Sequence, residues 1–502
     1  MVNNELFSDW LQHFADNDGE RLATVDIHTG RHLTYSELND RAKRLASGLK
    51  NRFTIEKNNR IAIIANNSSD IIELMFACWK LGAVFMPMNW RLSAFEIAEI
   101  FKEAEPSVVI YDSEFLELLQ HTKLPSLERQ ENLATSPYEQ LITESPASIT
   151  MPAVSLDDMN SLMYTSGTTG EPKGVIGTYR MTQTNVLQQA SIINSDSVCL
   201  TYAPLFHTAG LNGFTTPLFH FGGTLYIMRG WDADIAIKYL SSEKIGVTHT
   251  LGVPYHLTVL SQHPDFESTT FPALQVIGVG GAPANLKLIE RWYEKGVALS
   301  QSYGMTEIFG LIFQPPEAAR KNPKAAGKAL MYTDVQIGDD NGNPVASGQT
   351  GEIQVKSSGL TPGYWNKPKL TEASFVNGWF RTGDAGYVDS DGMFYIVDRI
   401  KDMYISGGEN VYPIEIENVI SKIPEVAMVA VIGVPDEQWQ EVGKACVLLR
   451  QGTKLTEEAV LDVCRKKLAK YKVPKSVEFL SSFPISGQGK ILKRELRKKY
   501  EE

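Results

Sequence analysis

The stretch RIAIIANNSSDIIELMFACWKLGAVFMP, residues 60–87, decides the fold class of the chain. It begins with an apolar run at 60–65 that suits a buried strand, continues with a helix-like segment at 69–81, and ends with a second strand candidate at 82–87. A strand, a helix and a strand at this spacing form a βαβ unit, which implies a parallel sheet covered by helices. Further strand candidates stand at 108–111, 225–228, 247–250 and 276–279. We therefore expect an α/β protein.

Upstream, residues 34–49 read as an amphipathic helix that opens on a cap-like Ser36. Its apolar residues recur near helical spacing, at Leu38, Ala42, Leu45 and Leu49.

The pattern of predicted secondary structure changes near residue 351. A β-rich stretch with Gly-Asp turns begins at 352–355 and runs to a strand candidate at 394–397. Beyond it we expect a smaller α+β unit with a helix at 413–421, a strand at 426–434 and a helix at 457–470. With the boundary at 398–401, the N-terminal domain spans 1–398 and the C-terminal domain 399–502.

The composition is that of an ordinary globular protein, with 502 residues, 43% hydrophobic and 21% charged. A formal net charge of −11 argues against a general affinity for nucleic acid or anionic lipid. The N-terminus lacks the pattern of a signal peptide, and no apolar run is long enough to span a bilayer. We expect a cytoplasmic protein with free thiols, because none of the cysteines has a metal-like or CxxC spacing: Cys78, Cys199, Cys446 and Cys464.

The segment YTSGTTGEPKGV, residues 164–175, predicts a phosphate-binding loop. Its glycines let backbone N–H groups approach an anion, its hydroxyl groups add donors, and Lys173 adds positive charge. It is not a Walker A loop, because Pro172 stands in place of the second glycine and Gly174 in place of the Mg²⁺-binding Ser or Thr. The alternative is a surface loop rich in Ser, Thr and Gly.

The same string resembles the signature of the adenylate-forming superfamily, which comprises acyl-CoA synthetases, luciferases and peptide-synthetase adenylation domains. Further stretches resemble the other motifs of that family in the same order: GGAP (280–283), QSYGMTE (301–307), WFRTGD (379–384), DRIKD (398–402), SGGENVYP (406–413) and GKILKREL (489–496). The resemblance covers essentially the whole chain. It implies an α/β fold in which the large N-terminal domain has parallel-rich βαβ sheets and a small β-barrel-like subdomain. A small mobile α+β domain follows, with a hinge at 398–402 that includes Lys401.

The resemblance implies ATP, Mg²⁺ and coenzyme A as ligands, with Thr165 and Glu307 holding Mg²⁺. It implies ATP contacts for Thr165, Ser166, Gly167, Thr168, Thr169, Gly170, Lys173, Gly281, Ala282, Pro283, Gln301, Ser302, Tyr303, Gly304, Thr306, Asp384, Ile396, Arg399 and Lys490. It implies catalytic roles for Lys490, His207 and Glu307, and a CoA-side strand at Gly407 and Gly408.

Each of these residues also has a structural interpretation. Asp384 suits an Asx-turn, Tyr303 a core aromatic position, and Lys490 a solvated basic tail. The family often has Pro-x-Thr before the lysine motif, whereas this chain has Pro484-Ile-Ser, so the geometry of that loop is open. His207 suits either a catalytic residue at the acyl pocket or a buried histidine at a helix start.

The segment PLFHTAGLNGF, residues 204–214, resembles the lining of the family's acyl pocket. Residues 204–216 contain no Asp or Glu to pair with an amino-acid ammonium group, and no Arg or Lys to pair with a second carboxylate. An apolar pocket for a medium or long fatty acid or an aryl acid is expected, lined by His207, Leu211, Phe214, Val279, Gly280 and Met305.

The resemblance therefore predicts an AMP-forming acid–thiol ligase that makes an acyl-adenylate and passes the acyl group to CoA. Two alternatives stay open: an o-succinylbenzoate-type CoA ligase or an acyl-AMP ligase that loads a carrier protein, and a non-catalytic protein that keeps the fold. We expect small-molecule partners, no nucleic acid and no transmembrane segment. The sequence leaves a homodimer open.

Overall fold

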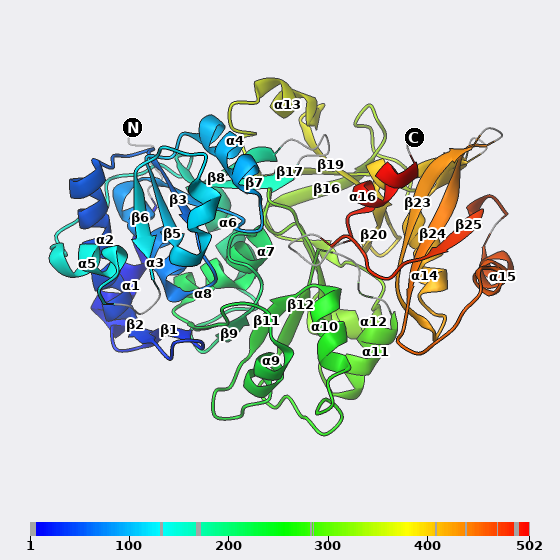
Figure 1. Cartoon of the computed structure of the whole chain (residues 1–502), viewed down its shortest axis with the longest axis horizontal. Coiled ribbons are helices and arrows are strands. Elements are labelled where there is room, and N and C mark those ends of the chain that lie inside the picture. Colours follow the sequence, from blue (N-terminus) through cyan, green and yellow to red (C-terminus); the bar gives the residue numbers. More distant parts are fainter. Residues whose placement is uncertain are drawn as a thin grey trace. The chain divides into compact units, whose positions relative to one another are not determined.

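The computed structural model describes residues 7–130, 134–166, 172–281, 284, 286–406, 409–436, 439–468, 470–485 and 491–500 (Figure 1). The chain divides into two compact units that interleave in sequence. Unit 1 comprises Met1–Pro323, Ala329–Thr333 and Ser357–Ala373. Unit 2 comprises Lys324–Lys328, Asp334–Lys356 and Ser374–Glu502.

The expected βαβ unit is confirmed in unit 1. Strand β3 (Arg60–Ile64), helix α3 (Ser69–Leu81) and strand β4 (Val84–Pro87) follow one another, and the two strands pair in parallel. They lie in a six-stranded sheet of order β6-β5-β3-β4-β7-β8. The other strands are β5 (Val108–Asp112), β6 (Ser126–Arg129), β7 (Met159–Ser166) and β8 (Pro172–Thr178). Only the β7–β8 pair of this sheet is antiparallel, and it forms the hairpin that carries the predicted phosphate loop.

A second sheet of unit 1 has the order β15-β14-β13-β12-β11-β9-β10-β1-β2. Its strands are β1 (Leu22–Asp26), β2 (His32–Thr34), β9 (Val198–Thr201), β10 (Thr224–Ile227), β11 (His249–Gly252), β12 (Val276–Val279), β13 (Leu299–Tyr303), β14 (Ile312–Phe313) and β15 (Lys328–Ala329). The strand predicted at 247–250 begins later, at His249. Just before it, Thr248 donates its N–H to Val198 O, and its hydroxyl accepts from the N–H of Val198, at 2.9 Å each.

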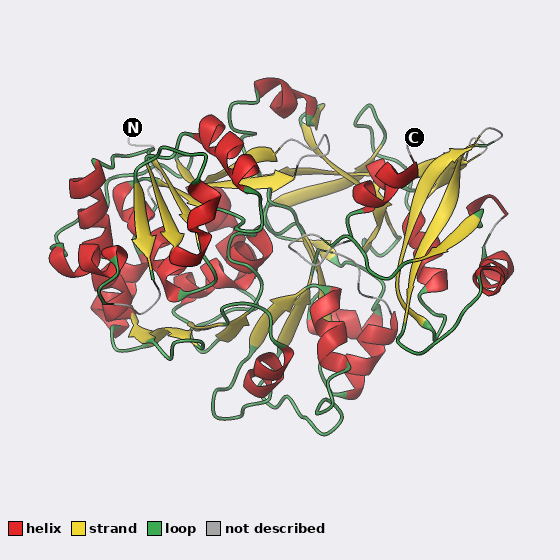
Figure 2. Cartoon of the chain, in the orientation of Figure 1, coloured by secondary structure: helices red, strands yellow, loops and turns green. Residues whose placement is uncertain are grey.

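Helices cover the sheets of unit 1 (Figure 2). They are α1 (Trp10–Asp18), α2 (Tyr35–Phe53), α4 (Ala94–Ala104), α5 (Pro137–Glu144), α6 (Tyr179–Gln189), α8 (Thr216–Phe221), α9 (Ala233–Leu240), α10 (Pro254–Ser261), α11 (Leu286–Glu294), α12 (Pro316–Lys321) and α13 (Pro368–Ala373). The predicted cap of the second helix is wrong. Thr34, not Ser36, caps α2, and it forms a capping box with Glu37 that satisfies the first free N–H groups.

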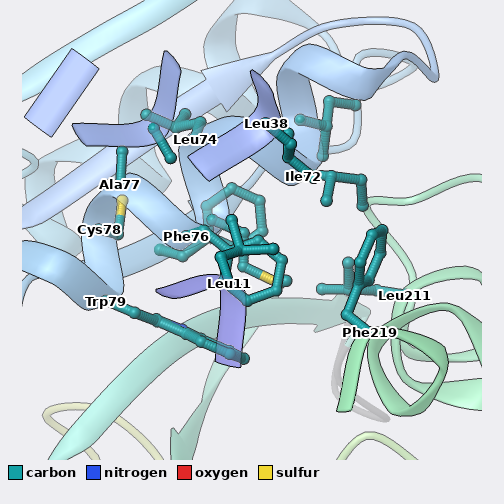
Figure 3. Packing of buried hydrophobic residues seen from close by; sticks show 14 of the residues in the cluster. Leu11, Leu38, Ile72, Leu74, Phe76, Ala77, Cys78, Trp79, Leu211 and Phe219 are labelled. Carbon is teal, nitrogen blue, oxygen red and sulfur yellow. The ribbon is translucent and has the colours of Figure 1, made fainter. Parts of the chain in front are cut away.

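The largest core of unit 1 lies around α3, and every residue of that helix is buried. Figure 3 shows Phe76, Trp79 and Leu74 of α3 near Leu11 of α1 and Phe219 of α8. Its charged residues Asp70, Glu73 and Lys80 are buried as well, and each is paired with an opposite charge, so the whole helix can lie inside unit 1.

In unit 2, a five-stranded sheet contains β16 (Thr333–Gly338), β17 (Gly351–Ser357), β18 (Phe375–Val376), β19 (Trp379–Val388) and β20 (Phe394–Arg399). After the turn η3 (Ile400–Asp402), the predicted α+β part follows. Its elements are β21 (Tyr404–Ser406), β22 (Glu409–Val411), α14 (Pro413–Ile420), β23 (Val426–Asp436), β24 (Gln440–Leu449), α15 (Glu457–Lys467), β25 (Ser476–Phe479) and α16 (Lys493–Arg497). The helix expected to reach 470 ends at Lys467. None of the helices in the described ranges has the length and apolar character that a bilayer crossing requires.

Candidate active site

The β7–β8 hairpin places two of the predicted ATP residues opposite each other. Thr165 of β7 pairs with Lys173 of β8 in antiparallel register, which puts their side chains on one face of the hairpin. Ser166 pairs with Pro172 through its backbone. The side chain of Ser166 and the residues Gly167, Thr168, Thr169 and Gly170 lie outside the described part of the chain.

Lys173 belongs to a closed triangle of polar contacts. Its Nζ donates hydrogen bonds of 2.8 Å to Glu307 Oε1 and 2.8 Å to the Tyr364 hydroxyl. Tyr364 in turn donates to the same Glu307 oxygen at 2.7 Å. Glu307 and Tyr364 are buried, so the triangle stands in a low-dielectric setting where such bonds are strong. The arrangement joins the loop lysine to the predicted Mg²⁺ ligand.

Tyr364 is a site residue that the sequence reasoning missed. It is fixed by a bridge to Val175 of β8, and the next residue, Trp365, donates its backbone N–H to Gly174 O at 2.8 Å. The segment around it, Thr361-Pro-Gly-Tyr-Trp365, carries no charge and no nucleophile. The one signal was an aromatic pair after a Pro-Gly turn, which core packing explains equally well.

The predicted run 301–307 links the second sheet to this triangle. Gln301, Ser302 and Tyr303 end β13, and a turn after Gly304 leads to Glu307. A side chain at position 304 would meet the backbone oxygen of Phe309 at 1.9 Å, so this turn requires glycine. The backbone oxygen of Glu307 accepts a hydrogen bond of 2.8 Å from the N–H of Thr361. The segment that carries Tyr364 is thereby fastened to Glu307 at two points.

The predicted adenine-side loop follows β12. Gly280 is buried and donates its N–H to Gly252 O at 3.1 Å, and Gly281 is exposed in the left-handed conformation at φ 78°. Ala282 and Pro283 lie outside the described residues. The side chain of Ser302 donates to Val279 O at 3.2 Å, so this loop starts directly beside β13. Thr306 and Met305 lie half-buried in the turn before Glu307.

The predicted acyl-pocket residues surround an irregular helix. His207 precedes the short helix α7 (Thr208–Gly210), which continues into a π-helical turn, η2 (Leu211–Thr215). Isolated π-turns occur frequently at functional sites. Leu211, Phe214 and Val279 are all buried. His207 is half-buried with its ring 4.4 Å from that of Phe206, so the structure places it both at a helix start and beside the predicted pocket.

Phe214 occupies the space next to Gly278. A side-chain carbon added at position 278 would meet the Phe214 ring at 3.3 Å and Leu251 at 3.4 Å. On its other side the Phe214 ring lies edge-on to His249, with ring centroids 5.7 Å apart. His249 Nε2 lies 3.0 Å from Ile192 O, and burial lowers the pKa of this imidazole to about 4. Phe214, Leu251 and His249 therefore form a neutral, largely apolar cluster beside Gly278.

Three of the ATP-contacting residues predicted in unit 2, Asp384, Ile396 and Arg399, lie on the paired strands β19 and β20. Asp384 of β19 pairs directly with Arg399 of β20, and Ile396 pairs with Gly386. Asp384 is 3% exposed, and its N–H donates to the hydroxyl of Thr382 at 3.1 Å, so the side chain that forms this turn is that of Thr382. The side chains of Arg399 and Lys401 lie outside the described part, although Lys401 stands in the turn η3. Gly407, Gly408 and Lys490 also fall outside the described residues.

The residues of unit 1 suit a magnesium nucleotide. Thr165 Oγ1 is buried without a hydrogen-bond partner among the described residues, and Thr165 stands opposite Lys173, which bonds Glu307. One hydroxyl and one carboxylate, completed by phosphate and water oxygens, are ligands that Mg²⁺ prefers. Within the described ranges no cluster of three His, Cys, Asp or Glu side chains could hold a metal by itself. The donor set fits a metal that arrives with its phosphates.

Comparison with known proteins gives consistent matches. The description "AMP-binding enzyme" fits residues 11–365, and "AMP-binding enzyme C-terminal domain" fits residues 415–490. The chain is 38% identical over 482 residues to a feruloyl-CoA synthase of Amycolatopsis sp, covering 95% of this chain and 96% of the relative. It is 38% identical over 505 residues to a long-chain-fatty-acid–CoA ligase of Mycobacterium tuberculosis, covering 98% of each. The o-succinylbenzoate coenzyme A synthetase of Bacillus subtilis, solved with ATP and a magnesium ion, superposes with a TM-score of 0.87 at 30% identity, covering 99% of this chain and 100% of that one.

Proposed function

The chain belongs to the AMP-binding enzyme family, and we propose that within it the protein is an ATP-dependent acyl- or aryl-CoA ligase. The observation that carries the proposal is the triangle of Lys173, Glu307 and Tyr364 beside the orphan hydroxyl of Thr165. A carboxylic acid and ATP would give acyl-adenylate and pyrophosphate, and CoA would then displace AMP to give the thioester.

Lys173 would neutralise charge on the phosphates of ATP, and Thr165 with Glu307 would hold Mg²⁺. When bound, Mg²⁺ would draw negative charge from the phosphate oxygens and orient them. Since the Lys173 ammonium group lies within hydrogen-bond distance of Glu307, we infer that it can bond both this carboxylate and a phosphate oxygen of the substrate. Tyr364 keeps its own bond to Glu307 and so preserves the direction of that carboxylate.

Asp384 would accept hydrogen bonds from the ribose hydroxyls, with Arg399 and Ile396 beside it on the β19–β20 ladder. We propose that Tyr303 stacks on the adenine ring. The burial of Asp384 supports its role, because a buried carboxylate forms strong hydrogen bonds with neutral hydroxyl groups.

Lys490 would act in the first chemical step. Attack of a carboxylate on the α-phosphorus brings two anions together, and an ammonium group aimed at the phosphoryl oxygens stabilises the charge that accumulates. The second step would use the thiolate of CoA as the nucleophile. All four cysteines are buried, so an acyl-enzyme on a protein thiol has no support.

We propose that residues 399–502 form the mobile domain, that residues 398–402 form its hinge, and that Gly407 and Gly408 face the pantetheine arm of CoA. His207, at the start of α7, would stand at the boundary between the acyl pocket and the thioester-forming side. The unpaired cysteines also agree with the cytoplasmic location that we propose.

For the acid, we propose a compact aryl acid in preference to a long fatty chain. The ring of Phe214 fills the space next to Gly278, and Leu251 and His249 stand behind it. A planar acid can lie against such a wall, whereas a long chain needs a channel through it. The two relatives at 38% identity act on acids of both kinds by their names, so identity alone does not separate the alternatives.

The test is AMP formation from ATP across a panel of ferulate, cinnamate, indoleacetate, o-succinylbenzoate, decanoate and palmitate, with and without CoA. We expect AMP release that depends on CoA and is fastest with an aromatic acid. AMP release that ignores CoA would remove the ligase proposal, and CoA-dependent turnover confined to palmitate would remove the aryl proposal. Light scattering on the same preparation tests the homodimer that the sequence leaves open.

A further inference from the structure

The C-terminal helix α16 is fastened to α14 at its first residue. Lys493 Nζ lies 2.8 Å from Glu417 Oε1, and the two side chains are only 15% and 12% exposed. The same Glu417 oxygen accepts a hydrogen bond of 2.7 Å from the backbone N–H of Val431 in β23. Glu417 is therefore fixed by the neighbouring strand, and it fixes Lys493 in turn.

A third charge stands near this pair. Asp398, the first residue of the predicted hinge, accepts a hydrogen bond of 3.0 Å from the N–H of Ile414 at the start of α14. Burial alone would lower the pKa of Lys493, but the negative charges of Glu417 and Asp398 outweigh it and raise that pKa. The ammonium group of Lys493 therefore stays charged at neutral pH and attracts both carboxylates.

The other end of α16 is fastened to the hinge segment. Arg497 Nη1 lies 2.9 Å from Asp402 Oδ1, and Arg497 Nη2 donates to the backbone oxygen of Asp402 at 3.1 Å. Asp402 ends the turn η3, which directly follows β20. Because the contact uses both the side chain and the main chain of Asp402, it fixes the turn itself. Leu496, between the two anchors, is buried against Ala430, Ile432, Cys446 and Phe483.

A backbone bridge fixes the chain just before α16. Ile485 and Ile491 form an antiparallel bridge, so the strand segments on either side of 486–490 lie next to each other. Lys490 stands one residue before this bridge and three before Lys493. Three residues span at most about 10 Å even when fully extended. In the sequence Lys490 is therefore tied to the anchored helix α16 by a link of only three residues.

We propose that Lys493 and Arg497 are positioning residues that hold the lysine-bearing C-terminal segment against α14 and against Asp402, the last residue of the hinge segment, so that these parts move as one body. The inference rests on the proposed function, in which 398–402 is the hinge and Lys490 acts in adenylation. A rotation about the hinge then carries Lys490 with it over a fixed path. Without the two anchors the hinge can turn while Lys490 arrives out of place.

Arg497→Met tests the proposal, because methionine keeps the apolar length of the side chain and removes both contacts with Asp402. We expect acid-dependent ATP–pyrophosphate exchange to fall about 10-fold or more, since small misplacements of a catalytic group are costly. Thioester formation from CoA and acyl-adenylate prepared beforehand should change less than about twofold, because Lys490 takes no part in that step. The matched control is Arg494→Met, which removes an exposed arginine from the same helix and should leave both half-reactions unchanged.

Exchanging the partners, Asp402→Arg with Arg497→Asp, should restore much of the lost adenylation. A role confined to general stability would not respond to this exchange. Amide hydrogen exchange of residues 491–500, read by mass spectrometry, should be faster in Arg497→Met than in Arg494→Met. The proposal is overturned if these two variants exchange alike, or if a folded Arg497→Met protein loses both half-reactions equally. If the unaltered protein adenylates no acid, the proposed function fails, whereas the hydrogen-exchange comparison still decides whether Arg497 fastens the helix.

Discussion

The hydroxyl of Tyr364 donates a 2.7 Å hydrogen bond to Oε1 of Glu307, across 57 residues of chain. The same hydroxyl accepts from Lys173, so one phenol connects the phosphate loop to the proposed magnesium ligand. Because Tyr364 touches both groups and is itself held by β8, it fixes the separation of Lys173 and Glu307.

Tyr364→Phe should raise the KM for ATP about 10-fold, because a hydrogen bond to a charged group contributes about 1.5 kcal/mol. Steady-state kinetics at saturating acid and CoA measure this change. Tyr332→Phe, which removes a hydroxyl from an exposed tyrosine, is the control and should have no effect. An unchanged KM for ATP and Mg²⁺ in a folded Tyr364→Phe protein would contradict a positioning role.

Lys490→Ala should abolish adenylation and leave thioester formation from preformed acyl-adenylate largely intact. The physical reason is that only the first step builds negative charge on the α-phosphoryl oxygens. ATP–pyrophosphate exchange and CoA-dependent release of AMP from acyl-adenylate measure the two steps separately. Equal loss of both would argue against a mechanism that uses two domain orientations.

Phe214→Ala should enlarge the acyl pocket and shift preference towards longer chains. The removed ring leaves open space beside Gly278 and Leu251, where an alkyl chain can lie. We expect the ratio of kcat/KM for decanoate over cinnamate to rise about 10-fold or more, since each buried CH₂ contributes about 0.8 kcal/mol. Phe95→Ala, at an exposed position, is the control. If kcat/KM falls by the same factor for decanoate and for cinnamate, Phe214 belongs to the general core and not to the pocket.

Arg129→Met should lower the free energy of unfolding of unit 1 by about 3–5 kcal/mol, because it removes the buried cation that pairs with the buried carboxylates of Asp70 and Asp112. Arg129 is 1% exposed, lies 2.6 Å from Asp70 and also pairs with Asp112. Urea unfolding followed by intrinsic fluorescence measures the loss. Arg44→Met breaks an exposed pair with Asp40 and should cost less than about 1 kcal/mol. An equal loss of unfolding free energy in the two variants would show that burial does not strengthen the Arg129 ion pairs.

Stability should fall as the pH drops from about 6.5 to about 4, partly through His249. Burial lowers the pKa of His249 from 6.5 to about 4, so between these values the unfolded chain binds a proton that the folded chain does not. The contribution of this group is complete above pH 6.5 and amounts to about 3 kcal/mol by proton linkage. Burial lowers the pKa of His256 in the same way. His249→Gln should therefore reduce the slope of unfolding free energy against pH without abolishing it. His28→Gln, at an exposed site, should leave the slope unchanged.

The fold was readable from sequence wherever periodicity is strong. The apolar runs at 60–65 and 82–87 and the helix between them stand in the structure within a residue or two of the predicted bounds. The errors lie at the ends of elements. Thr34 caps α2 through a capping box with Glu37, a local Thr-x-x-Glu pattern that the sequence does contain. The start of β11 at His249 depends instead on how Thr248 meets Val198, which is 50 residues away in the chain.

The candidate site was less predictable. The pairing of Thr165 with Lys173 and of Asp384 with Arg399 follows from strand register, which the motifs alone do not contain. Tyr364 had no chemical signature, because a tyrosine beside tryptophan in an uncharged segment is normally a core residue. Its function became visible only when β8 brought it next to Lys173.

The burial of the four cysteines affects whether the thioester product can acylate the protein itself. Thioesters react readily with exposed thiolates, yet Cys78, Cys199, Cys446 and Cys464 are buried, and burial raises the pKa of each thiol. The enzyme is thus protected against acylating itself at high product concentration. Buried thiols also react slowly with maleimide dyes. A single cysteine introduced at an exposed position, Met331 or Lys466, could therefore be labelled selectively. A pair of such labels would follow the proposed hinge rotation in real time.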